Sequence, residues 1–149
     1  MPEEMIFLNL IQAIETYHAR FYGDRVKDYN ERIARKFPKE QSYDFVRGLL
    51  VIDVKKRNVP LKKRLLELLI GKYDGLFCDY YLDGCKFVES IVDTRNYYTH
   101  YDPKKEKKAL KGEDLIKAIN VLSCLLNYYI CKELDVDLEE KTRDYLSEL

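Results

Sequence analysis

The most apolar stretch of the chain, residues 113–134, places the strongest limit on the fold. Between Ala118 and Cys131 the clearly polar residues are Asn120, Ser123 and Asn127. A helix that is apolar around most of its circumference must be covered by other elements on most of its sides. We therefore expect residues 113–134 to form the central helix of a packed bundle.

Other segments carry apolar residues on one face, at the spacing of an amphipathic helix. In residues 3–22 these are Phe7, Leu10, Ile11, Ile14, Tyr17 and Phe21. The same reasoning predicts helices over residues 24–36, from Ser42 to about residue 56, after Pro60, from near Cys85 to Asp102, and in the acidic tail after residue 135. No alternating pattern indicates a strand, and no repeat or linker divides the chain. The prediction is an all-α bundle of about five to seven helices in a single domain, residues 1–149.

Charge and cysteine content narrow the class of protein further. Lys plus Arg and Asp plus Glu are equal at 26 each, so the overall charge neither predicts nor excludes a nucleic-acid partner. The four cysteines lack the close pairing of a zinc site, and we expect free thiols, no metal and no other cofactor. Without a signal-peptide pattern or an apolar run near eighteen residues, we expect no membrane partner and a cytoplasmic location.

Residues 86–103, KFVESIVDTRNYYTHYDP, contain the side chains best suited to catalysis. Their apolar residues follow a helical spacing that ends near Asp102-Pro103, so Arg95, Asn96 and His100 lie in the last turns. Asn96 and His100 project on nearly the same side, whereas Arg95 and His100 diverge by roughly 140°. Arg95 and His100 can act on one group if the helix loosens near His100, or if a second copy of the motif faces the first.

The residue types from Arg95 to His100 are a more specific signal than the Arg-to-His spacing alone. An Arg-x4-His pair is expected by chance ~0.12 times in this composition, and a following Asn lowers the figure to ~0.005. At these residues the chain resembles the HEPN superfamily of α-helical ribonucleases, whose signature is Arg, four to six residues, then His, often with a polar residue after the Arg. It resembles most the ApeA-like HEPN group in residues 95–102 and, more faintly, over almost the whole chain.

The resemblance implies a compact HEPN-like bundle whose motifs pair across a two-fold axis, with cleavage that leaves a 2′,3′-cyclic phosphate. ApeA-like domains usually lie C-terminal to another region. The resemblance therefore also allows this chain to be the C-terminal domain of a longer protein, with an N-terminal domain as a further partner.

RNA supplies its own nucleophile, the 2′-OH, so cleavage needs proton transfer and positive charge on the phosphate. His100 can transfer protons near neutral pH, Arg95 can hold two phosphate oxygens, and Asn96 can orient either group. One histidine cannot readily serve both ends of an in-line attack, which favours a homodimer. We expect a metal-independent endoribonuclease that cleaves single-stranded RNA at a composite Arg/His site, in phage defence or a toxin-type response.

Further residues are candidates for a supporting role. Glu15 lies beside His18 on the first helix, where a local surface pair with His18 is the simpler interpretation. The resemblance keeps open the alternative that Glu15 reaches into a neighbouring site, because related chains often carry a Glu hereabouts. Tyr97 and Tyr101 flank the motif, where tyrosines either pack half-buried with a hydrogen-bonded tip or stack on bases.

The loop after His100, residues 101–112, is rich in lysine. The candidates for RNA binding are Lys104, Lys105, Lys107 and Lys108. The alternative is a solvated loop, and the basic triplets at residues 55–57 and 62–64 have the same two interpretations, with Arg64 expected to remain solvated.

Two alternatives to catalysis remain. On spacing alone, Arg95 would pair with Asp93 or Glu89 and His100 would cap its helix, so both would be structural. The second function to consider is a non-catalytic HEPN-type dimerisation or interaction module, which would bind a partner without turnover.

Overall fold

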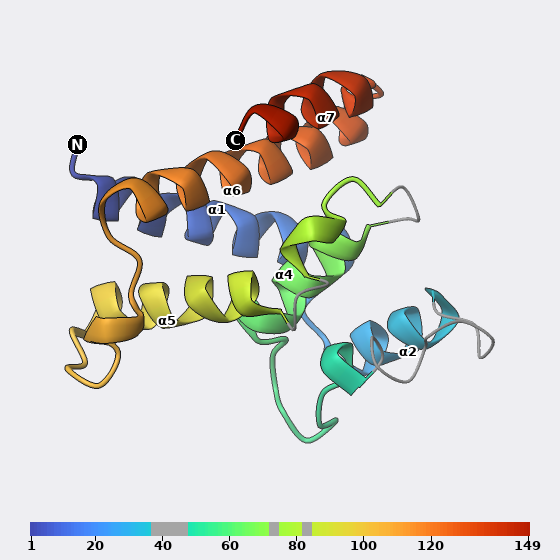
Figure 1. The fold of residues 1–149 in the computed structure, drawn as a ribbon. Coiled ribbons are helices and arrows are strands. Elements are labelled where there is room, and N and C mark those ends of the chain that lie inside the picture. The colour runs from blue at the N-terminus through green and yellow to red at the C-terminus, as the bar shows by residue number, and fades with distance from the viewer. Residues whose placement is uncertain (37–47, 72–74, 82–84) are drawn as a thin grey trace.

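The computed structural model describes residues 1–36, 48–71, 75–81 and 85–149, and these form an all-α bundle (Figure 1). The α-helices are α1 (Glu3–Tyr22), α2 (Val26–Lys36), α4 (Leu61–Ile70), α5 (Lys86–His100), α6 (Gly112–Glu133) and α7 (Glu139–Glu148). Two short 3-10 helices are η1 (Cys78–Tyr80) and η2 (Glu106–Lys108). No strand occurs in these ranges, where an isolated antiparallel bridge joins Arg25 to Asn58. The predicted all-α class is confirmed.

The helix predicted from Ser42 to about residue 56 ends earlier than expected. Residues 37–47 lie outside the described residues; residues 48–50 are helical, and the chain leaves the helix after Leu50. The Asn30 side chain of α2 explains the change, because it donates to the Ile52 carbonyl at 2.8 Å and accepts from the Ile52 N–H at 3.2 Å. A side-chain amide thus satisfies the backbone groups that a longer helix would have paired.

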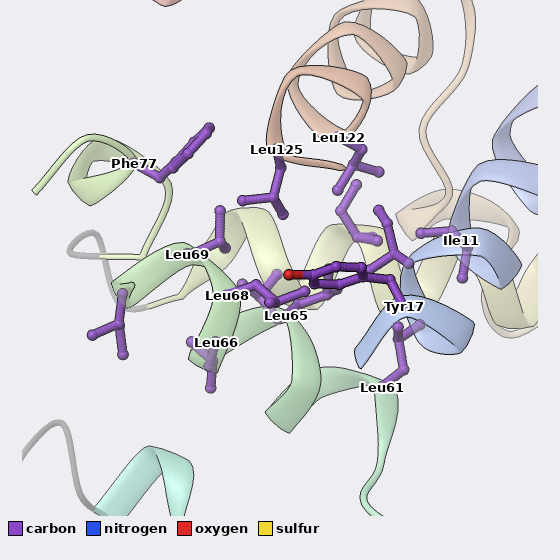
Figure 2. Packing of buried hydrophobic residues seen from close by; sticks show 14 of the residues in the cluster. Ile11, Tyr17, Leu61, Leu65, Leu66, Leu68, Leu69, Phe77, Leu122 and Leu125 are labelled. Atoms are coloured by element: carbon purple, nitrogen blue, oxygen red, sulfur yellow. The ribbon is translucent and has the colours of Figure 1, made fainter. Parts of the chain in front are cut away.

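The core lies where α1, α4 and α6 meet. In Figure 1, α1 lies between α6 and α5, and α7 folds back along α6. Figure 2 shows Leu122 and Leu125 of α6 beside Tyr17 of α1 and the leucines of α4. These side chains belong to one buried cluster, which orders the outer helices against α1 and α6.

The central helix α6 is less completely covered than its composition predicted. Leu122 and Leu125 are fully buried, but Ile116 and Ile130 are exposed. Contrary to our expectation, α6 is long and apolar enough to cross a membrane by length and composition, and it is the one such helix among the described residues. A core helix passes the same test, and the packing of α6 against α1 and α7 is that of a core helix.

Candidate functional site

The C-terminal half of α5 carries the Arg-Asn-x3-His motif. Val88, Ile91 and Thr94 form its buried face, Arg95 and Asn96 are half-buried, and His100 is exposed as the last residue of the helix. These positions follow from the helical spacing of the buried residues. Thr94 lies on the same face as Ile91, and the C-terminal end of the helix is open to solvent.

The helix does not loosen before His100. Tyr101 ends α5 in the left-handed region, with φ of 49°, and its N–H donates to the Tyr97 carbonyl in the ordinary i to i−4 pattern. Arg95 and His100, five residues apart on a regular helix, therefore project on different sides. Within one chain, α5 does not bring the two motif residues together.

Arg95 instead meets Glu15, from α1. The distance from Arg95 Nη1 to Glu15 Oε1 is 3.6 Å, and the two side chains are 30% and 36% exposed. Arg95 Nε is buried without a hydrogen-bond partner in the described residues. Glu15 therefore contacts a residue of the motif. This agrees with the interpretation that Glu15 reaches into a neighbouring site.

The two acidic residues beside Arg95 on α5 have other partners. Asp93 Oδ1 lies 2.9 Å from Lys105 Nζ, and Glu89 Oε1 lies 3.4 Å from Lys62 Nζ. The ion pair of Arg95 is thus between helices, with its carboxylate partner supplied by α1.

The lysine-rich loop is held against α5. The Leu110 N–H donates to Thr94 Oγ1 at 2.9 Å, and the Tyr98 hydroxyl donates to the Leu110 carbonyl at 3.0 Å. The hydrogen bond and charge of Asp93 raise the pKa of Lys105. The other three lysines proposed to bind RNA are exposed: Lys104, Lys107 and Lys108.

The motif tyrosines form a group of rings at the same helix end. The Tyr97 ring centre lies 5.1 Å from that of Tyr98 and 5.8 Å from that of Tyr101, both in edge-to-face orientation. Tyr98 is a packing residue with a bonded hydroxyl, as expected for a half-buried tyrosine, whereas Tyr101 is 69% exposed.

His18 does not form a surface pair with Glu15, and that interpretation is wrong. His18 is 0% exposed; its Nε2 lies 2.6 Å from Glu67 Oε1, and its Nδ1 lies 2.9 Å from Arg64 Nη1. Arginine can only donate, so Nδ1 accepts and the Nε2 N–H donates to the carboxylate, which makes the imidazole neutral. Burial lowers the pKa of His18, consistent with that state.

Arg64 and Glu67 of α4 complete a buried network that the sequence analysis missed. Arg64, expected to be solvated, is 5% exposed and donates to the Val59 carbonyl and to Asp24. Arg32 donates to both Glu67 oxygens, at 2.7 and 2.9 Å. Burial raises the pKa of Glu67, but the hydrogen bonds from His18 and Arg32 outweigh it and lower the pKa.

Glu15 connects this network to the motif. Burial lowers the pKa of Arg64, and the Glu15 carboxylate is the foremost group that opposes this shift. Glu15 therefore lies within electrostatic range of Arg64 while it contacts Arg95. Arg64 is itself held by hydrogen bonds to His18 and Asp24.

The described residues contain no group of three or more His, Cys, Asp or Glu side chains placed to hold a metal ion. All four cysteines are free thiols, of which Cys85 is buried. The site is therefore built from Arg95, Glu15, Asn96 and the exposed His100, with lysines on the adjoining loop.

Comparison with protein families agrees with this all-α fold. The model of the Apea-like HEPN family matches residues 8–140, a range that includes α2, α4, α5 and α6 and most of α1. The chain belongs to the Apea-like HEPN family. Searches of curated proteins and of solved structures give no significant match.

Proposed function

We propose that the chain is an endoribonuclease that cleaves single-stranded RNA at a site completed by a second copy of itself. Membership of the HEPN family supports a ribonuclease or a nucleotide-binding type of module. One observation favours the composite site: the regular end of α5 directs Arg95 and His100 to different sides. A second α5 that faced the first would bring Arg95 of one copy and His100 of the other to the same group.

In this proposal Arg95 binds the scissile phosphate. Its guanidinium is partly exposed, so a phosphate can approach it from solvent. Glu15 orients the guanidinium from the opposite side, and Asn96, on the same face as His100, orients the phosphate or the imidazole.

The two His100 side chains divide the proton transfers. A neutral His100 accepts the proton of the 2′-OH as that oxygen attacks the phosphorus. The P–O5′ bond breaks, and the protonated His100 of the second copy gives its proton to the leaving O5′. The products are a 2′,3′-cyclic phosphate and a 5′-hydroxyl. Arg95 stabilises the extra negative charge of the phosphorane between these steps.

The second candidate is a non-catalytic dimerisation or interaction module. The ion pair between Arg95 and Glu15 favours it, because a paired guanidinium is what a purely structural arginine would show. The two functions differ in turnover: the enzyme cleaves RNA, and the module binds its partner and releases it unchanged.

Cleavage of a defined single-stranded RNA in excess EDTA tests the proposal. The matched control is the same oligonucleotide with 2′-deoxy sugars, which lack the attacking oxygen. We expect cleavage of the RNA alone, with cyclic phosphate ends, by a species that sediments at about twice 17.8 kDa. Binding without cleavage would favour the module, and a strict monomer at high concentration would eliminate the composite site.

A further inference from the structure

A cavity of about 610 Å³ lies beside the motif, within the size range of ligand pockets. Its lining residues come from the start of α1, the end of α5 and the start of α6, which lie at the same end of the bundle (Figure 1). The residues that matter for its chemistry are Tyr97, Tyr98, Tyr101, Glu3, Glu4 and Lys111. We refer to it as the tyrosine pocket.

The aromatic part of the pocket has one largely exposed ring, that of Tyr101, which can receive a flat ligand. Tyr98 is anchored through its hydroxyl to the Leu110 carbonyl and supports Tyr97 edge-on. Tyr101 packs against Tyr97 and is largely exposed. Exposed aromatic faces next to a positively charged loop are the usual means by which single-stranded nucleic acids are held.

The backbone of Tyr101 adds an independent observation. Its φ of 49° lies in the left-handed region, where the end of a helix usually has Gly or Asn. A bulky residue in this conformation costs about 1 kcal/mol or more relative to glycine. The edge-to-face contact with Tyr97 returns about as much as this conformation costs, so stability alone gives little preference for a tyrosine at this position.

The polar part of the pocket combines acceptors with one cation. Glu3 and Glu4 line it with exposed carboxylates. Lys111 Nζ lies 5.6 Å from the Tyr97 ring centre, at the edge of the same pocket. Carboxylates only accept hydrogen bonds, and an ammonium only donates them. A ligand that fits must therefore present donors on one edge and acceptors on another.

Guanine has this pattern of groups. Its Watson–Crick edge carries two adjacent donors, N1–H and N2–H, which match one carboxylate, whereas adenine, cytosine and uracil each present a single donor group there. Its O6 and N7 are acceptors that lysine commonly binds. Tyr101, which lines the pocket, directly follows His100 in the chain, so a bound base could belong to a nucleotide near the reacting phosphate.

We propose that the tyrosine pocket binds a guanine base and so makes the chain select RNA at guanine nucleotides. This inference rests on the proposed ribonuclease function for its role, but the binding itself can be measured without cleavage. Tyr101 stacks on the base and Tyr97 supports Tyr101 edge-on. Glu3 or Glu4 accepts from the Watson–Crick edge of the base, and Lys111 donates to O6, N7 or the neighbouring phosphate.

Calorimetric titration with guanosine, adenosine, cytidine and uridine 5′-monophosphates tests the binding. We expect guanosine monophosphate to bind at least tenfold more tightly than the other three. Tyr101→Gly should lower that affinity at least tenfold while the Tm stays the same or rises, because glycine relieves the left-handed conformation. Tyr145→Gly, at an exposed tyrosine of α7, is a control for the loss of a surface ring and should leave nucleotide binding unchanged.

Mapping the cleavage positions distinguishes a base within RNA from a free nucleotide. Cuts that cluster beside guanine in the wild-type chain and spread evenly in Tyr101→Gly support the inference. Equal affinity for the four mononucleotides, or unchanged binding in Tyr101→Gly, overturns it even if RNA is cleaved. Guanosine monophosphate binding without cleavage of any RNA would contradict the ribonuclease proposal and leave the pocket as a guanine nucleotide site.

Discussion

Arg95 Nη1 of α5 lies 3.6 Å from Glu15 Oε1 of α1, and this contact joins the motif helix to the first helix of the chain. Both side chains are about one-third exposed, so water screens the pair and its contribution to stability is on the order of 0–1 kcal/mol. The contact therefore matters chiefly for orientation. It holds the guanidinium relative to the core before RNA arrives.

Replacement of Glu15 tests that orienting role. Glu15→Ala should lower kcat for RNA cleavage about tenfold, equivalent to about 1.4 kcal/mol of transition-state stabilisation, because Arg95 loses its fixed partner. KM should change little, since the positive charge remains. Glu31→Ala, at an exposed position of α2, removes the same charge far from the motif and should leave kcat unchanged. An equal loss in both variants would show a general electrostatic effect.

The loop lysines should contribute to RNA affinity unequally. Substitution of Gln for the three exposed lysines, Lys104, Lys107 and Lys108, should weaken binding and reduce the slope of log K against log salt by up to about 2. Lys105→Gln should change the slope less, because Asp93 already neutralises that ammonium group. Binding titrations at several salt concentrations give the slopes.

Three exposed lysines elsewhere provide the control for total charge: Lys27, Lys117 and Lys141. Their replacement by Gln should leave the salt slope near that of the wild type. If the control triple and the loop triple change the slope equally, the loop has no special contact with phosphate.

The buried His18 should make folding stability depend on pH. Its pKa in the folded chain is lowered by burial, so the unfolded chain binds a proton at a higher pH than the folded one. Stability is therefore present above the unfolded value of about 6.5 and is lost as pH falls. The lowered pKa of Glu67 acts in the same direction at lower pH. The Tm should fall on acidification from about pH 8 to about pH 5.

Because the chain has two histidines, replacing each in turn shows which one causes the dependence of Tm on pH. His18→Gln keeps one donor for Glu67 and one acceptor for Arg64, so it should fold and show a weaker dependence of Tm on pH between about pH 7 and about pH 5. His100→Gln, at the exposed helix end, should retain the wild-type dependence. A flat profile for His100→Gln would place the responsible titration at His100.

The helices were predictable because local patterns define them. The apolar spacing of residues 3–22 and the acidic first turn agree with α1, and Asp102-Pro103 correctly indicated the end of α5. The helix after Ser42 was predicted too long because the partner of Ile52 is a side chain of α2. No periodicity within a segment contains that information.

The positions of the candidate site residues were more predictable than their contacts. Glu15 was named as a supporting residue, and the structure brings it to Arg95. Arg64 follows two lysines and looks solvated in sequence, yet it is buried because His18 and Asp24 arrive from outside its own helix. A buried polar network needs partners from several elements at once, and only the assembled fold shows them.

Arg95 and His100 should each be required for turnover. Arg95→Ala and His100→Ala should lower RNA cleavage by on the order of 10²-fold or more, with Tm and dimer mass intact, because both side chains lie at a partly exposed helix end. Asn96→Ala should do less harm. The Arg95/His100 double variant should be little worse than either single one, since the groups act in one transition state. Activity that tracks only the folded fraction would make both residues structural.

The most direct test of a site shared between two copies mixes wild-type chain with His100→Ala chain. At a ratio of 1:3, after subunit exchange, about one quarter of the wild-type chains pair with another wild-type chain. A site that needs both His100 side chains then predicts that cleavage per wild-type chain, in EDTA, falls to about one quarter. Cleavage per wild-type chain that stays constant across all mixing ratios would contradict the composite site.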